Sequence, residues 1–184
     1  MLNHLLKGQA IVMFAYGLSG AGKTYTVFGP DDPKRNDAWF KSNTPQKQWG
    51  LFPRIAYDML HLATKHKEDG WVVRVKYFQN VIHDVINLFS DSSPPERRPF
   101  KEMHKDHHGF MDISWIKPSI ITSWDELLQL LDKANHLKYI APTQFNPSST
   151  RGHCILFYEV DMPMKMKSGK RVISIDPWLM NALN

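Results

Sequence analysis

Three stretches of the chain carry the apolar patterns of β-strands. Residues 10–15 form an unbroken apolar run, which is typical of a strand buried on both faces of a parallel sheet. Residues 71–78 alternate between apolar and basic positions, and this period of two predicts a half-buried strand. An apolar strand over 154–162, a charged turn over 165–170 and a second strand over 171–175 together predict a hairpin.

Three other stretches predict helices. Residues 24–28 are expected to form a short helix before a Gly-Pro pair ends it. A helix is predicted over 53–67, because proline is tolerated at the first helical position and apolar residues recur at helical spacing. Ser123 and Glu126 form a capping box, whose side-chain oxygens accept hydrogen bonds from N–H groups at a helix start. A helix is therefore predicted over 123–135.

The segments between these elements are mostly polar. Residues 29–50 are expected to form a long loop, although three aromatic side chains within it indicate partial packing. Residues 81–89 are apolar and fit a strand or a helix, and residues 90–99 are rich in turn-forming types. Short strands are expected within 100–117.

The eight residues from Gly17 to Thr24 match the phosphate-binding pattern G-x-x-x-x-G-K-T. Glycines let the backbone fold into a cup whose N–H groups face an anion. In such a loop the lysine reaches the β- and γ-phosphates, and the threonine hydroxyl ligates Mg²⁺. A plain glycine-rich turn after a strand is the alternative. The candidate binding residues are Gly17, Leu18, Ser19, Gly20, Ala21, Gly22, Lys23 and Thr24.

The order of the elements predicts an α/β fold. An apolar strand and phosphate loop, followed by strands that alternate with helices, indicate a P-loop NTPase with a central, mostly parallel sheet flanked by helices. The ligand of such a sheet lies at the carboxyl ends of its strands. With 184 residues, the chain is long enough for one domain with its own core.

Composition narrows the class further. Hydrophobic residues make up 42% and charged residues 22%, which is typical of a globular protein. The single cysteine, Cys154, excludes an internal disulfide and suits a reducing compartment, and it is expected in the core. No apolar run is long enough to span a membrane, and the N-terminus lacks a secretion signal, so a cytosolic protein is expected. The net charge of +5 favours polyanionic partners without choosing among nucleic acid, anionic lipid and acidic protein surfaces.

A second candidate segment covers residues 146–153, which read Asn-Pro-Ser-Ser-Thr-Arg-Gly-His. An NTPase needs an element that senses the γ-phosphate and places the attacking water, and hydroxyls beside an arginine suit that task. Taken alone, the segment is more typical of an ordinary loop, because serine and asparagine build turns readily.

Together these segments resemble the kinesin motor domain. Residues 14–26 are similar to the family's F-A-Y-G-Q-T-G-S-G-K-T-Y-T, and residues 50–54 to its G-I-I-P-R. Residues 75–89 follow the spacing of V-S-Y-L-E-I-Y-N-E-x-V-Y-D-L-L, and residues 143–153 resemble the first switch, T-x-M-N-x-x-S-S-R-S-H. The order and spacing agree over nearly the whole chain, so the resemblance implies one partial kinesin motor domain over residues 1–184.

The resemblance also implies roles for particular residues. The phosphate loop would bind the triphosphate of ATP, and Tyr25 would stack on adenine. Ser149, Thr150 and Arg151 would be the catalytic residues: Ser149 positions the lytic water, Thr150 lies near Mg²⁺ and the water, and Arg151 pairs with a glutamate of the second switch. Thr24 and Thr150 would ligate Mg²⁺, and Asp176 would hold it through water.

The implied partners are microtubules, ATP and ADP, with no membrane and no nucleic acid, and the implied location is the cytoplasm and its microtubule cytoskeleton. Three functions compete. The first is an ATP-dependent microtubule motor fragment that hydrolyses Mg-ATP, and the second is a degenerate kinesin-like protein that binds nucleotide or tubulin without turnover. The third is a small phosphotransferase or nucleic-acid NTPase, against which the first-switch match argues.

The chain departs from the family pattern in its last residues. The second switch reads D-L-A-G-S-E in the family, but here Leu179 replaces the glycine and Asn181 the glutamate. The family's first strand and its final third have no counterpart in this sequence. A sheet without its outer strands exposes edges and apolar faces, so the chain expressed alone is expected to fold poorly or aggregate.

Two polar clusters have simpler explanations. His104, His107 and His108 lie close in sequence but lack a cysteine partner, so a solvated loop is favoured over a metal site. A nearby basic run fits either a solvated loop or, by the resemblance, contact with the acidic surface of tubulin. The run consists of Arg97, Arg98, Lys101 and Lys105.

Overall fold

The structure is a computed structural model, and most of the chain is described in it. The described residues are 2–7, 9, 11–18, 20–32, 34, 38–81, 83–106, 109, 111–138, 152–166, 169–175 and 178–183. Beyond residue 162, the strands are described by their backbone.

One sheet organises the described chain. Its strands follow the spatial order β1-β8-β6-β2-β3-β4, while β5 pairs with β2 and β7 pairs with β6. The strands are β1 Val12–Ala15, β2 Val72–Val81, β3 Asp84–Asn87, β4 Arg97–Pro99, β5 Ser119–Ile121, β6 Gly152–Met166, β7 Gly169–Ile175 and β8 Trp178–Leu183.

The prediction of a mostly parallel sheet is wrong. Among the described strands, only β1 and β8 run parallel, and every other pair is antiparallel. The longest pairing joins β2 to β6 over ten residues of each strand, from Val72↔Asp161 to Val81↔Gly152. Only two residues separate β2 from β3 and β6 from β7 in the sequence, and such short connections produce antiparallel neighbours.

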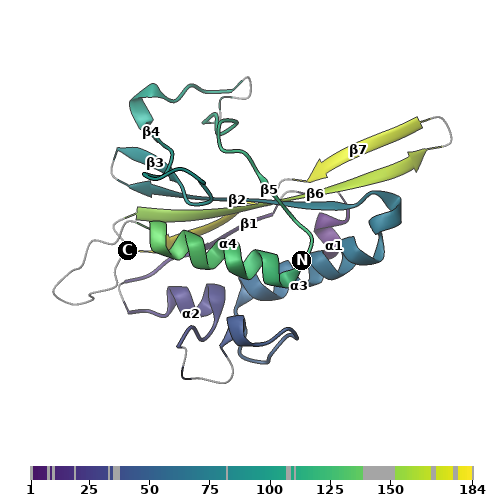
Figure 1. The fold of residues 1–184 in the computed structure, drawn as a ribbon, viewed down its shortest axis with the longest axis horizontal. Coiled ribbons are helices and arrows are strands. Elements are labelled where there is room, and N and C mark those ends of the chain that lie inside the picture. Colours follow the sequence, from purple (N-terminus) through teal and green to yellow (C-terminus); the bar gives the residue numbers. More distant parts are fainter. Residues whose placement is uncertain are drawn as a thin grey trace.

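Three helices cover one face of this sheet. Figure 1 shows α2 Lys23–Phe28, α3 Leu51–Lys65 and α4 Trp124–Leu137 below the sheet, and the segment that follows β4 on the opposite side. A fourth helix, α1 Leu2–Leu5, is one turn long. Short 3₁₀ helices occur at Trp39–Lys41, Lys67–Asp69 and Phe100–Glu102.

The core lies mainly between the three helices and the sheet. Phe52 of α3 and Leu127 of α4 are fully buried there against Val75 and Tyr77 of β2. A smaller cluster on the opposite face contains Phe78, Val85, Ile116 and Ile155. The predicted half-buried strand is confirmed on its core side, and its basic side chains form ion pairs across to β6. These pairs are Arg74 with Asp161 and Lys76 with Glu159.

The strand before the phosphate loop is less buried than predicted. Val12 is 59% and Phe14 70% exposed, whereas the alternate residues Met13 and Ala15 pack against the main core. The expectation of burial on both faces is therefore wrong. Packed helices bury only one face of β1, and no described residue covers its other face.

The remaining predicted elements agree in part. The helix predicted over 53–67 spans Leu51–Lys65, and the helix predicted over 123–135 spans Trp124–Leu137. Ser123 Oγ accepts a hydrogen bond from Glu126 N at 3.2 Å, as predicted, but the Glu126 carboxylate accepts from Thr122 N at 2.8 Å, one residue before the cap. The predicted hairpin is confirmed as β6 and β7.

The run over 81–89 fits a strand or a helix by its sequence, and the structure decides for a strand, because the run contains β3. Within 100–117 the described residues form a 3₁₀ turn and one isolated bridge between Lys105 and Met111, so the expected short strands are wrong there. A strand in this region begins only at Ser119.

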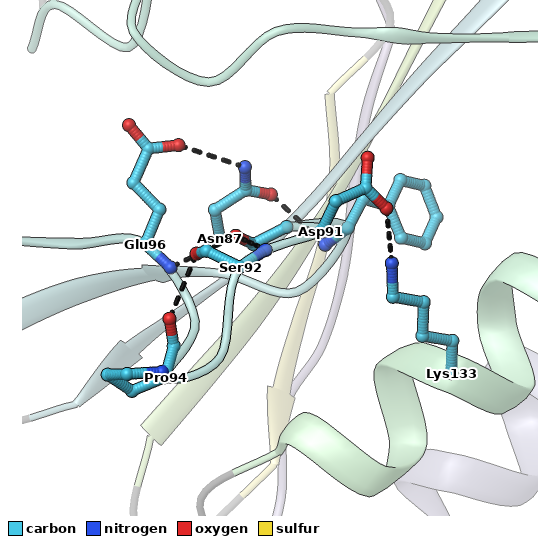
Figure 2. A network of polar contacts seen from close by, with 8 residues as sticks. Asn87, Asp91, Ser92, Pro94, Glu96 and Lys133 are labelled. Carbon is cyan, nitrogen blue, oxygen red and sulfur yellow. Dashed lines mark hydrogen bonds and ion pairs between the residues drawn. The ribbon is translucent and has the colours of Figure 1, made fainter.

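The turn-rich loop between β3 and β4 is ordered by its own polar groups (Figure 2). Asn87 Oδ1 accepts from Phe89 N at 3.0 Å, and Ser90 Oγ accepts from Glu96 N at 3.1 Å. Lys133 of α4 donates to Asp91 Oδ1 at 2.5 Å, and this hydrogen bond holds the pKa of Asp91 below its ordinary value. The contact ties the loop to a helix on the core side of the sheet.

Candidate nucleotide-binding site

The phosphate-loop pattern lies between a strand and a helix, as its sequence requires. Strand β1 ends at Ala15, and α2 begins at Lys23. The backbone between them uses the left-handed region at Gly20 (φ 80°) and Gly22 (φ 85°), which side chains other than glycine rarely adopt. A Cβ built on either glycine would meet no atom within 4 Å, so the space beside both is open.

Lys23 is folded back into this loop. Its side chain is only 7% exposed, and its Nζ donates to the carbonyl oxygens of Gly17 at 2.8 Å and Leu18 at 2.9 Å. These are hydrogen bonds that phosphate oxygens can replace, because both sets of oxygens accept from an ammonium. The loop therefore holds a positive charge where an anion would sit.

Thr24 and Tyr25 follow on α2. Thr24 is half-buried and lines a cavity of about 200 Å³ together with Phe28, Asp31 and Lys138. Tyr25 is 49% exposed, and its phenol donates to Gln48 Oε1 at 3.2 Å. Thr24 therefore faces the interior, whereas Tyr25 faces solvent.

Lys138, at the end of α4, is a charged residue that sequence reasoning missed. Its Nζ lies 5.2 Å from the ring centre of Tyr77 and 5.8 Å from that of Phe28, and it donates to Asn135 Oδ1 at 2.8 Å. Burial lowers the pKa of this ammonium. Nothing in the sequence marks it, because a lysine at the end of an amphipathic helix is usually solvated.

The sheet register brings the end of β1 and the start of β6 to one edge. Ala15, the last residue of β1, pairs with Asn181 of β8, and Gly152, the first residue of β6, pairs with Leu183 of β8. The carboxyl end of β1 and the amino end of β6 therefore lie at the same edge. A Cβ at Gly152 would lie 2.4 Å from the carbonyl oxygen of Asn80, so β6 starts in close contact with β2.

Several predicted site residues lie outside the described residues. They are Ser19 of the phosphate loop, Ser149, Thr150 and Arg151 of the segment that resembles the first switch, and Asp176. Leu179 and Asn181, which depart from the family pattern, lie in β8 beside β1. Their register partners are Met13 and Ala15, respectively.

The polar clusters predicted beyond the site are exposed. His104 faces solvent, while His107 and His108 lie outside the described residues. No group of metal-binding side chains occurs in the described part of the chain. The basic run is also exposed, with Arg98 4.9 Å from the ring centre of Trp115.

No helix among the described residues is long and apolar enough to cross a membrane.

The comparisons with known proteins agree on one family. Residues 1–176 match the family model described as the kinesin motor domain. Kinesin-like protein KIF22 of Mus musculus is 29% identical over 180 residues, which cover 92% of this chain and 24% of the relative. Kinesin-like protein cut7 of Schizosaccharomyces pombe is 28% identical over 170 residues, which cover 92% of this chain and 15% of the relative. The chain spans about a quarter or less of the length of these relatives.

A solved structure has a similar fold. It is a KIF14 fragment with ADP in complex with a microtubule. The TM-score is 0.75 at 17% sequence identity, and the match covers 100% of this chain and 48% of the other. At this identity the likeness supports the fold alone.

Proposed function

This chain belongs to the kinesin motor domain family, whose model matches residues 1–176, and we propose that it binds Mg-ATP through residues 17–25. We propose further that it is part of a microtubule motor that couples ATP hydrolysis to movement, with microtubules as its partner in the cytoplasm. The observation that carries the proposal is the buried ammonium of Lys23 inside a glycine-rich loop at the carboxyl end of β1.

The residues of the loop suit a nucleotide triphosphate. Gly17, Gly20 and Gly22 take positive φ values, a backbone form that can turn successive N–H groups toward an anion. The ammonium of Lys23 would exchange its two carbonyl partners for phosphate oxygens, and Thr24 would offer its hydroxyl to Mg²⁺. When bound, Mg²⁺ neutralises charge on the phosphates during phosphoryl transfer.

The roles assigned to the other segment remain proposals drawn from the family resemblance. Ser149 would orient the attacking water, Thr150 would lie at Mg²⁺, and Arg151 would stabilise the closed segment. Asp176 would hold Mg²⁺ through water. The position of β6 supports this assignment, because its first described residue, Gly152, lies at the same sheet edge as the end of β1.

Nucleotide binding without hydrolysis is the second candidate function. Leu179 and Asn181 stand where the family has the glycine and glutamate of the second switch. Both belong to β8, where the backbone is paired with β1 instead of forming a loop. With asparagine at 181, the resemblance offers Arg151 no carboxylate partner, and this observation favours a binder over a motor.

The first test is a Lys23→Ala variant. Removing the ammonium should weaken binding of a fluorescent Mg-ATP analogue by about 100-fold, because charge-assisted hydrogen bonds contribute most to phosphate affinity. Lys65→Ala is the matched control, since Lys65 is an exposed lysine at the far end of α3. Equal affinity of wild type and Lys23→Ala would contradict the site, as would wild type that binds no nucleotide.

A second measurement separates the motor from the binder. Release of phosphate from Mg-ATP is followed with and without microtubules, and co-sedimentation is measured in both nucleotide states. Turnover stimulated by microtubules supports the motor. Nucleotide or microtubule binding without turnover supports the second candidate.

A further inference from the structure

An apolar cleft lies at the end of β2 that is farther from the candidate nucleotide site. Residues of α3, β2 and β5 line it, and its volume is about 280 Å³. β2 begins at this cleft with Val72, which pairs with Asp161. The strand ends at Val81 beside Gly152, at the edge that contains the carboxyl end of β1. The cleft is therefore separate from the phosphate loop.

Apolar side chains form most of the walls of the cleft. Ile120 is 53% exposed, so part of this apolar surface is in contact with water. Clefts with mostly apolar walls and few polar groups are typical of small-molecule sites, because a ligand that covers the walls displaces that water. The apolar lining includes Leu60 and Ala63 of α3, Trp71, Val73 of β2, and Ile120 and Ile121 of β5.

The hydroxyl groups of the lining already donate to other groups. Thr64 Oγ1 donates to the Leu60 carbonyl at 2.8 Å. Thr122 donates to Glu126 Oε2 from its N at 2.8 Å and from its Oγ1 at 3.0 Å. A hydroxyl has a single proton to donate, so a phosphate group with several oxygens would find few donors in this cleft.

Lys67 is the one charged residue among the described residues that line the cleft. It is exposed, and within the described part of the chain its ammonium makes no hydrogen bond or ion pair. The acidic residues that follow it, Glu68 and Asp69, do not line the cleft, and Asp69 lies 3.1 Å from His66 Nδ1. A lysine stem can follow apolar walls while its ammonium stays in water. The cleft thus combines apolar walls with one positive charge.

The turn that carries Lys67 is fixed before a ligand arrives. Asp69 N donates to the His66 carbonyl at 3.0 Å, and Gly70 N donates to the Lys67 carbonyl at 2.9 Å. The Trp71 ring stacks on His66 with ring centres 4.6 Å apart. A fixed turn lowers the entropic cost of binding. The same hydrogen bonds occupy carbonyl oxygens that follow α3, which reduces the negative partial charge at that helix end.

We propose that this cleft binds a small carboxylic acid with an apolar tail, its carboxylate at Lys67 and its tail against Ile120 and Trp71. The volume admits roughly nine heavy atoms at about 30 Å³ each, which is about the size of octanoate. A carboxylate beside the exposed Lys67 keeps part of its hydration, so it avoids the cost of full burial. The inference does not depend on the proposed nucleotide function, because none of residues 17–25 lines the cleft.

The test is calorimetric titration of the full chain with octanoate and, separately, with octylammonium, which has a similar tail and the opposite charge. At physiological salt, wild type should bind octanoate about fivefold more tightly, the factor expected of one partly exposed ion pair. Lys67→Glu should reverse this preference. Lys65→Glu is the matched control, because Lys65 is exposed on the last turn of α3 and does not line the cleft, and it should keep the preference.

A second variant tests the location. Thr64 is an exposed residue of the lining, and Thr64→Phe should narrow the cleft and weaken binding of both ligands about tenfold, with thermal unfolding measured alongside to verify the fold. A folded Thr64→Phe protein with wild-type affinity would place the ligand elsewhere and overturn the inference. So would a wild type that binds neither ligand or both equally, or a Lys67→Glu variant that still prefers octanoate.

Discussion

At the scale of single residues, the buried hydroxyl of Tyr158 affects how the stability of this protein depends on pH. Tyr158 lies in the middle of β6, is 3% exposed and stacks on Phe52 with ring centres 5.7 Å apart. Within the described part of the chain its hydroxyl has no hydrogen-bond partner. Burial raises the pKa of this phenol well above its ordinary value of 10.0. The folded state therefore disfavours its ionisation.

Replacement of Tyr158 by phenylalanine should leave stability at pH 7 equal or slightly higher, because it removes an unsatisfied buried hydroxyl. Above pH 10 the unfolded chain loses the Tyr158 proton while the folded chain keeps it, so wild-type stability should fall by about 1.4 kcal/mol per pH unit from this group. The free energy of unfolding of Tyr158→Phe should not show the part of this decrease that comes from the Tyr158 phenol.

Urea unfolding at pH 8 and again at a pH above 10 measures the effect. The buried Tyr77 and Cys154 also have raised pKa values, so both proteins decline. The difference between them reports the contribution of Tyr158, including its effect on the pKa of Tyr77. A difference that does not change with pH would contradict the prediction.

At the scale of elements, the junction between α2 and α3 depends on Gly50. The loop over 29–50 begins after α2, and its last residue lies against the end of that helix. There Gly50 N donates to the carbonyl oxygen of Phe28 at 3.1 Å. A Cβ on Gly50 would lie 2.5 Å from the carbonyl group of Val27. The ordinary φ of −72° at Gly50 means that this contact, and not backbone strain, requires glycine.

Gly50→Ala should therefore destabilise the fold by about 2–3 kcal/mol, because backbone atoms of α2 must move to admit the methyl group. Gly109→Ala is the contrasting variant. At Gly109 the space is open, but φ is +85°, so its cost should be about 1 kcal/mol from strain alone. Thermal and urea unfolding of both variants measure the two costs. Gly50→Ala as stable as wild type would contradict the close approach of the two helices.

The same junction explains why the loop over 29–50 is packed. Trp39 and Trp49 are both buried, and both contact the ring of Trp124 at the start of α4. The aromatic residues in this polar stretch correctly indicated partial packing. The sequence did not indicate that their partner would be a residue about 80 positions away, since such contacts depend on the fold.

At the scale of the whole molecule, the exposed face of β1 is an apolar surface close to the candidate site. Val12 and Phe14 lie on it, and β1 is the terminal strand in the described sheet order. An exposed apolar strand at a sheet edge favours association with other chains. The expectation that the chain expressed alone folds poorly or aggregates stays a prediction, and this face is where association should begin.

Phe14→Ser should reduce self-association at rising protein concentration, measured by light scattering. It should change the free energy of unfolding by only about 0.5 kcal/mol, because Phe14 is 70% exposed and loses little packing. Ile120→Ser is the matched control, an apolar residue that is 53% exposed on β5. If Ile120→Ser reduces association as much as Phe14→Ser does, the association does not centre on β1.

The sequence pointed to those residues of the candidate site that belong to a short motif, but not to their partners from distant segments. Residues 17–24 were singled out because glycine, lysine and threonine at that spacing form a pattern that is closely tied to one kind of ligand, a phosphate group. Tyr25 was singled out through the family resemblance, but its partner Gln48 was not, because glutamine in a polar loop carries no pattern. Arg54 was recognised as part of a family motif, and the structure adds its contacts with the backbone of residues 46–49.

The sequence by itself determined the features that depend on neighbours along the chain. These are the phosphate loop, the capped helix at Ser123, the alternating strand β2 and the hairpin of β6 and β7, since each follows from local spacing and turn chemistry. Only the tertiary structure decided the direction of strand pairing, the exposure of β1 and the partial burial of Lys138. Those properties depend on which segments meet across the sheet. The sequence pattern of an apolar run or of a lone lysine is the same whichever surface that segment contacts in the folded protein.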